Sequence, residues 1–289
     1  MLQAFELTIP TSLDEALGAL GDDAAPLAGG TNLLVDMRAG TAPTRLVGID
    51  RLAGLRRIDT TGGRVALGAL TTITDVLRHP DMATLGPSMV ASARLFGGQM
   101  VRNAATVAGN VAYGSPAADM MPPLLSLDAE VTLTSARGSR SMPLDGLFTG
   151  FKESVRESDE LITEIAWPTP AANSANLFYK LGLRKGDAVS IVCLAVTVAA
   201  EAGACSRARI ALGAVAPTVI RAREAEAMLE GAALTPALID AAGRRAAEEC
   251  SPIDDIRASA SYRRHVVHML TRRLVAHAWD QIGATGGPS

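Results

Sequence analysis

The chain has 289 residues and a mass of 29.9 kDa, which exceeds the usual size of one hydrophobic core and favours two or three packed parts. Hydrophobic residues make up 48% and charged residues 20%, so extensive disorder is not expected. The net charge of -3 and the aromatic content of 3% lack the basic excess and the stacking surfaces of nucleic-acid-binding proteins. We therefore expect no nucleic-acid partner.

The cysteines and the apolar runs indicate the compartment. Three cysteines are scattered through the chain with no closely spaced pair, which argues against a disulfide framework, an iron-sulfur cluster or a structural zinc site. The first ten residues show no basic segment followed by an apolar core, as a secretory signal would. The most apolar run, residues 191–200, is about half the ~20 residues that a membrane span requires. We expect a soluble cytoplasmic protein with no integral membrane segment and no metal site.

The N-terminal segment predicts a small first lobe, residues 1–55. The sequence from Ser12 to Glu15 has the form of a capping box, and leucines at helical spacing follow it until Gly21, so a helix is expected. A strand at 26–28, a turn at 28–34 and a second apolar stretch read as a strand, loop and helix unit. Apolar runs at 46–49 and 64–70 predict further strands.

A second lobe is predicted over residues 56–172. Helical spacing occurs at 72–77 and 87–96, and a further helix is expected at 120–127. Residues 99–119 are rich in small polar residues and read as a long loop, which at that length is more typical of function than of connection. A hairpin about residues 136–139 and a strand at 161–165 complete this lobe.

The third predicted part, residues 177–285, combines a sheet with helices. Apolar or alternating runs at 177–183, 189–199 and 207–213 predict a three-stranded antiparallel sheet. Thr235 followed by a proline predicts the start of a helix, and apolar residues at every fourth position from Tyr262 predict a long final helix.

Two short segments share a chemistry suited to phosphate. Gly29 and Gly30 expose backbone N–H groups beside the hydroxyl and amide of Thr31 and Asn32, and the segment from Thr106 to Asn110 repeats this arrangement. Two such turns from one half of the chain would hold a pyrophosphate without a lysine, because peptide dipoles supply the positive potential. The alternative, two tight turns with no ligand, stays open. Neither a G-x-G-x-x-G nor a P-loop motif is present.

Three other residues have both a functional and a structural interpretation. Asp119 is suited to accepting hydrogen bonds from ribityl or ribose hydroxyls, or else to capping the helix that follows it. Phe96 would stack on a ring system or fill the core. Lys180 would stabilise a reduced, anionic flavin or project into solvent from its strand. No set of catalytic acid, base and nucleophile is found, so no catalytic residues are predicted.

Three segments together resemble a known family. They are residues 28–34 (AGGTNLL), 98–110 (GQMVRNAATVAGN) and 115–129 (SPAADMMPPLLSLDA), and their order and spacing are similar to those of the FAD-binding medium subunit of molybdenum hydroxylases. This is the xanthine dehydrogenase and aerobic carbon monoxide dehydrogenase family. The resemblance extends through residues 159–165, 180–187 and 210–218, and so covers nearly the whole chain.

The resemblance implies an α+β fold with a two-lobed FAD-binding domain of the vanillyl-alcohol-oxidase (PCMH-like) type, followed by the C-terminal sheet and helices. It implies that the two turns hold the pyrophosphate, that Phe96 and Ile162 flank aromatic parts of the cofactor, that Asp119 binds hydroxyls and that Lys180 approaches the flavin. Ser115 is a weaker candidate. Tyr113 is bulkier than the residue often found there and would shield the flavin or fill a gap. The implied pyrophosphate residues are Ala28, Gly29, Gly30, Thr31, Asn32 and Leu33 in the first turn, and Thr106, Val107, Ala108, Gly109 and Asn110 in the second.

The implied function is that of an oxidoreductase subunit. It would pass electrons from [2Fe-2S] clusters of a small partner subunit through FAD to an external acceptor. A large partner subunit would carry molybdopterin, and the complex would be a dimer of heterotrimers. No histidine lies near residues 28–34, which implies non-covalent FAD. A self-contained FAD-dependent oxidase and a non-redox nucleotide-binding module are the alternatives. The substrate, whether carbon monoxide, a purine, an aldehyde or an N-heterocycle such as nicotine, would be chosen by the large subunit.

Overall fold

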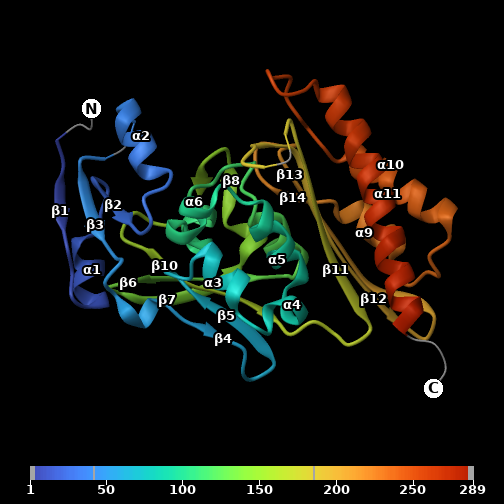
Figure 1. Cartoon of the computed structure of the whole chain (residues 1–289), viewed down its shortest axis with the longest axis horizontal. Helices are drawn as coiled ribbons and strands as arrows, with labels where there is room; N and C mark the ends of the chain where they lie inside the picture. Colours follow the sequence, from blue (N-terminus) through green and yellow to red (C-terminus); the bar gives the residue numbers. More distant parts are fainter. Residues whose placement is uncertain (1–3, 42, 185, 286–289) are drawn as a thin grey trace.

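The computed structural model describes residues 4–41, 43–184 and 186–285. Residues 1–3 and 42 of the predicted first lobe, and residue 185 of the third part, therefore lie outside the described chain. Three groups of elements follow one another along the long axis of the molecule, with the N-terminal group at one end and helices α10 and α11 at the other (Figure 1).

The first group is a parallel three-stranded sheet of order β1-β3-β2. Helix α1 (Leu13–Ala19) connects β1 to β2, as predicted, and the Ser12 hydroxyl caps it by accepting the N–H of Glu15 at 3.2 Å. Helix α2 (Leu33–Ala39) connects β2 to β3, which confirms the strand, loop and helix unit. The strands are β1 (Glu6–Thr8), β2 (Ala24–Leu27) and β3 (Arg45–Gly48).

The second group contains an antiparallel five-stranded sheet of order β4-β5-β10-β6-β7. Its hairpin β6–β7 turns at the predicted position. Two short 3-10 helices, Ala53–Leu55 and Leu144–Gly146, and a small hairpin of β8 (Phe148–Gly150) and β9 (Glu153–Ser154) accompany it. The strands are β4 (Ile58–Asp59), β5 (Arg64–Gly68), β6 (Glu130–Ser135), β7 (Gly138–Pro143) and β10 (Leu161–Pro168).

Six short helices connect β5 to β6, and they correct the prediction of a long loop at 99–119. That segment forms two six-residue helices, α6 and α7, followed by an irregular stretch. Six residues are too few to show a helical period, and in α7 the small side chains hid the pattern further. The helices are α3 (Ile73–Arg78), α4 (Met82–Leu85), α5 (Pro87–Leu95), α6 (Gln99–Ala104), α7 (Val107–Ala112) and α8 (Met121–Ser126).

The third group is an antiparallel sheet of order β11-β12-β13-β14, in which the three predicted strands are joined by a fourth of two residues. Helices α9 and α11 pack on one face, and α5 and α8 on the other (Figure 1). Because both faces are covered, β12 is buried over ten consecutive residues. The elements are β11 (Ser174–Gly182), β12 (Ser190–Glu201), β13 (Ala204–Gly213), β14 (Ile220–Arg221), α9 (Arg223–Leu229), α10 (Pro236–Glu248) and α11 (Ala260–Thr285).

Two clusters of buried apolar side chains form the core. One fills the first two groups and the other lies between the third sheet and its helices. Ala211 of β13 and Val219 belong to the first cluster, so apolar packing continues across the junction near residue 172. The lobe and domain limits 1–55, 56–172 and 177–285 remain predictions. In the part of the chain that the structure describes, no helix is long and apolar enough to cross a membrane.

Asn176 of β11 fastens this junction with hydrogen bonds. Its side chain is 5% exposed; Oδ1 accepts the N–H of Ser88 at 2.9 Å, and Nδ2 donates to the hydroxyls of Ser126 at 3.2 Å and Thr197 at 2.8 Å. The amide therefore joins α5, α8 and β12. A buried polar network of this kind stabilises a structure only while every member keeps a partner.

We expect Asn176→Ala to lower the free energy of unfolding by about 2 kcal/mol, because it leaves buried donors and acceptors unpaired. Urea denaturation of the full chain measures this loss. The matched control is Asn173→Ala, whose side chain is exposed and should change stability by less than about 0.5 kcal/mol. Equal stabilities of the two variants would contradict the assignment.

Candidate cofactor site

A cavity of about 280 Å³ lies where the first two groups of elements meet. Both predicted turns line it, and so do both residues expected to flank aromatic rings. The predicted residues that line it are Ala28, Gly29, Gly30, Thr31, Asn32, Leu33, Phe96, Thr106, Ala108, Gly109, Asn110 and Ile162.

The first turn leads from β2 into α2, and each of its glycines is there for a different reason. Gly30 has a φ of +67°, a left-handed conformation that other residues rarely adopt. Gly29 is confined by space: a Cβ built on it would lie 1.8 Å from the carbonyl oxygen of Ala104. No protein acceptor pairs with the backbone N–H groups of residues 29–33 within the described chain. The turn therefore offers five consecutive donors beside the cavity.

The second turn is held by its own side chains. The Thr106 hydroxyl accepts the N–H of Gly109 at 2.9 Å and so caps α7, while Asn110 Oδ1 accepts the N–H of Met120 at 3.1 Å. The N–H groups of Thr106 and Ala108 have no acceptor among the described residues. Ala108 is helical, so its methyl group causes no backbone strain in this turn.

The contact between Gly29 and Ala104 brings the two turns together. Ala104 ends α6, immediately before Ala105 and Thr106, so the first turn touches the segment that leads into the second. Both turns line the same cavity, and their role in holding a pyrophosphate remains a prediction. Unpaired amide donors from two sides of a small cavity are suited to an anionic group such as a phosphate.

Tyr113 also lines the cavity. It follows α7, its hydroxyl donates to Asp36 of α2 at 3.3 Å, and the Nζ of Lys152 lies 4.1 Å from the centre of its ring. The ring therefore bridges the helices that begin at the two turns, and the cation-π contact favours this position.

Two charged residues that the sequence analysis missed also line the cavity, Arg156 and Glu160. The Arg156 guanidinium donates to the carbonyl of Glu160 at 2.7 Å, and burial lowers the pKa of this group. Two hydrogen bonds from Arg140, at 2.6 and 2.8 Å, hold the pKa of Glu160 below its ordinary value. Arg156 lies outside the segments that carry the family resemblance, whereas Glu160 lies within one of them, residues 159–165. That segment, which also contains Ile162, was the available signal.

Four predicted site residues do not line this cavity: Val107, Ser115, Asp119 and Lys180. Val107 is fully buried in the core, and the Ser115 hydroxyl accepts the N–H of Ala117 at 3.2 Å in a local turn. Lys180 and Asp119 form an ion pair with each other at 2.6 Å. Asp119 does not cap α8, because Met120 is the N-cap of that helix. Lys180 does not project into solvent, because its side chain is 6% exposed.

The pair between Asp119 and Lys180 crosses from the second group to the third sheet. Ser190 of β12 donates a further hydrogen bond to Asp119 at 3.0 Å. Burial raises the pKa of Asp119 above its ordinary value, against the opposing charge and hydrogen bond of Lys180. A role of these two side chains toward the cofactor remains a prediction.

Comparison with known proteins shows which protein family the chain belongs to. Residues 3–170 match the model of the FAD binding domain in molybdopterin dehydrogenase. The chain belongs to this family. Residues 177–278 of this FAD-binding subunit match the C-terminal domain of CO dehydrogenase flavoproteins. Its cofactor is FAD, and it is an oxidoreductase subunit.

Individual relatives support this family assignment over nearly the whole chain. The subunit is 34% identical to the carbon monoxide dehydrogenase medium chain of Hydrogenophaga pseudoflava over 95% of this chain and 97% of that protein. It is 31% identical to the nicotinate dehydrogenase FAD-subunit of Eubacterium barkeri, over 97% and 98%. The carbon monoxide dehydrogenase structure from H. pseudoflava that lacks the Mo-pyranopterin moiety superposes with a TM-score of 0.93, at 34% identity over 97% of this chain and 99% of that one. The expected fold is thereby confirmed.

We expect Gly29→Ala to separate the two turns, because its Cβ would overlap the carbonyl of Ala104. The variant should lose bound FAD and about 2 kcal/mol of unfolding free energy. Flavin absorbance per protein and urea denaturation measure the two effects. Gly18→Ala is the control: it lies on an exposed face of α1 with open space around it, and should keep FAD and gain up to about 1 kcal/mol. Full flavin content in Gly29→Ala would contradict the packing argument.

Proposed function

We propose that this FAD-binding subunit accepts electrons from [2Fe-2S] clusters of a partner subunit and delivers them to an external acceptor within a molybdenum hydroxylase complex. FAD supplies the redox chemistry when bound. The observation that carries the proposal is the cavity between the two turns, whose unpaired amides suit the diphosphate of a flavin nucleotide.

The fit of the cavity to FAD can be judged from its walls. Gly29, Gly30 and the following amides would hold the diphosphate from one side, with Thr106 and Ala108 on the other. Phe96 and Ile162 would cover an aromatic part of the cofactor from the apolar wall. Among the described residues, those that line the cavity include no histidine or cysteine, so we propose that FAD is held without a covalent bond.

We further propose the partners and the assembly. Relatives described as a medium chain or medium subunit include the nicotine 6-hydroxylase medium subunit of Paenarthrobacter nicotinovorans, at 31% identity. By analogy, a large subunit would carry molybdopterin and choose the substrate, a small subunit would carry the [2Fe-2S] clusters, and two such heterotrimers would associate in the cytoplasm. The chain itself would provide the flavin and the path to the acceptor.

Affinity purification of the tagged chain from its own cells tests this proposal. We expect two further subunits to co-purify, with FAD, iron and molybdenum measured in the complex by absorbance and elemental analysis. In the isolated chain we expect FAD alone and no substrate oxidation. An isolated chain that oxidises an alcohol or amine unaided would contradict the proposal in favour of a self-contained oxidase. A chain that binds no FAD would contradict it in favour of a nucleotide-binding module.

A further inference from the structure

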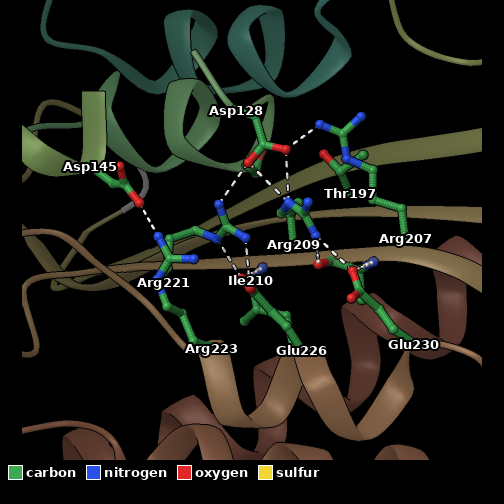
Figure 2. A network of polar contacts seen from close by, with 12 residues as sticks. Asp128, Asp145, Thr197, Arg207, Arg209, Ile210, Arg221, Arg223, Glu226 and Glu230 are labelled. Atoms are coloured by element: carbon green, nitrogen blue, oxygen red, sulfur yellow. Dashed lines mark hydrogen bonds and ion pairs between the residues drawn. The ribbon is translucent and has the colours of Figure 1, made fainter. Parts of the chain in front are cut away.

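Asp128 is the centre of an ion-pair network at the junction between the second group and the third sheet (Figure 2). It stands two residues after α8 and accepts hydrogen bonds from Arg209 at 2.8 and 2.9 Å and from Arg221 at 2.7 Å. Arg207 pairs with the same carboxylate. One acid from the N-terminal side thus contacts three arginines of β13 and β14.

The arginines are already held on their own side of the junction. Glu226 of α9 pairs with Arg221 through bonds of 2.5 and 2.6 Å, and Glu230 accepts from Arg209 at 2.7 Å. In Figure 2 the two glutamates lie on one side of the arginines and Asp128 on the other. The guanidinium groups are therefore pre-oriented toward the position that Asp128 occupies.

The backbone of Asp128 supports a specific role for its side chain. Its φ is +51°, in the left-handed region where glycine and asparagine are the usual residues. Aspartate tolerates this conformation but gains nothing from it, so the carboxylate itself accounts for its presence. Burial alone would raise the pKa of Asp128, yet hydrogen bonds from Arg207 and Arg209 outweigh it and hold the pKa below its ordinary value. The group is therefore charged at neutral pH.

The other end of α8 is tied to the cavity. Met120, its N-cap, donates its N–H to Asn110, and Asn110 lines the cavity as the last residue of the second turn. All six residues of α8 are buried, and the helix packs against β11, β12, β13 and β14. A short rigid helix thus connects the network at Asp128 to the turn at Thr106–Asn110.

We propose that Asp128 is a positioning residue: by fixing the C-terminal sheet to α8, it holds the Asn110 turn in place and so sets how tightly the subunit retains FAD. The proposal rests on the proposed function for the identity of the ligand. It assigns to the C-terminal sheet a role in a site that it does not itself line.

The test compares Asp128→Asn with a matched control, Asp240→Asn, in the full chain. Asparagine suits the left-handed backbone, keeps the size of the side chain, and replaces the charged carboxylate with an amide that has only one acceptor oxygen. The Asp240 side chain is 25% exposed against 27% for Asp128, and it also has several partners, Arg244, His268 and Arg272, but all of them lie within α10 and α11. Loss of either carboxylate should therefore lower global stability comparably.

Two readouts separate positioning from stability. In the chain without FAD, hydrogen exchange of peptides covering residues 106–120 should accelerate in Asp128→Asn and stay at the wild-type rate in Asp240→Asn. With FAD bound, release after dilution, followed by flavin fluorescence, should be about tenfold faster in Asp128→Asn only. A second variant, Arg207→Gln, removes one partner from the partly exposed rim of the network and should show the same changes to a smaller extent. If Asp128→Asn does not fold, Arg207→Gln takes its place in the test.

Unchanged exchange at 106–120 in the folded variants, or equal FAD release in Asp128→Asn and Asp240→Asn, would overturn the positioning role. A wild-type chain that takes up no FAD would instead refute the proposed function, and the exchange comparison would still decide whether Asp128 controls the turn.

Discussion

The structure of the site depends on one close approach, between the backbone of Gly29 and the carbonyl oxygen of Ala104. A Cβ at residue 29 would lie 1.8 Å from that oxygen, so no other residue permits the approach without movement of one segment. This contact sets the separation of the two turns and therefore the width of the cavity between them. In the first turn, and at Thr106 and Ala108 of the second, the backbone N–H groups have no protein acceptor among the described residues. The reason is that α2 and α7 begin at these turns, and the first N–H groups of a helix have no partner within it.

The third sheet is packed firmly against the elements next to this site. It is covered on both faces, by α9 and α11 on one and by α5 and α8 on the other. Its contacts with α8 and the residues on either side of that helix are polar at three points, through Asn176, Asp128 and the pair of Asp119 with Lys180. Buried polar contacts are directional, so they fix the register of one part against the other more closely than apolar packing alone.

Much of this fold could be predicted from the sequence, where side chains act locally. Ser12 and Thr235 marked helix starts through hydroxyls that cap them, and the hairpin between β6 and β7 followed from its turn residues. Helices α6 and α7 were missed because six residues are too few to show a helical period. Asp119 and Lys180 were each predicted to face the cofactor, yet they bind each other across 61 residues, a pairing set by the packing of β11 against the segment before α8. Arg156 and Glu160 were missed for the same reason, since only the folded sheet brings them to the cavity.

The central claim is that the two turns hold a diphosphate through their backbone amides. Calorimetric titration of the FAD-free chain with ADP and with adenosine tests it most directly, because the two ligands differ only in the diphosphate. We expect ADP to bind at least about tenfold more tightly, a difference of about 1.4 kcal/mol. Equal affinities of ADP and adenosine would contradict it.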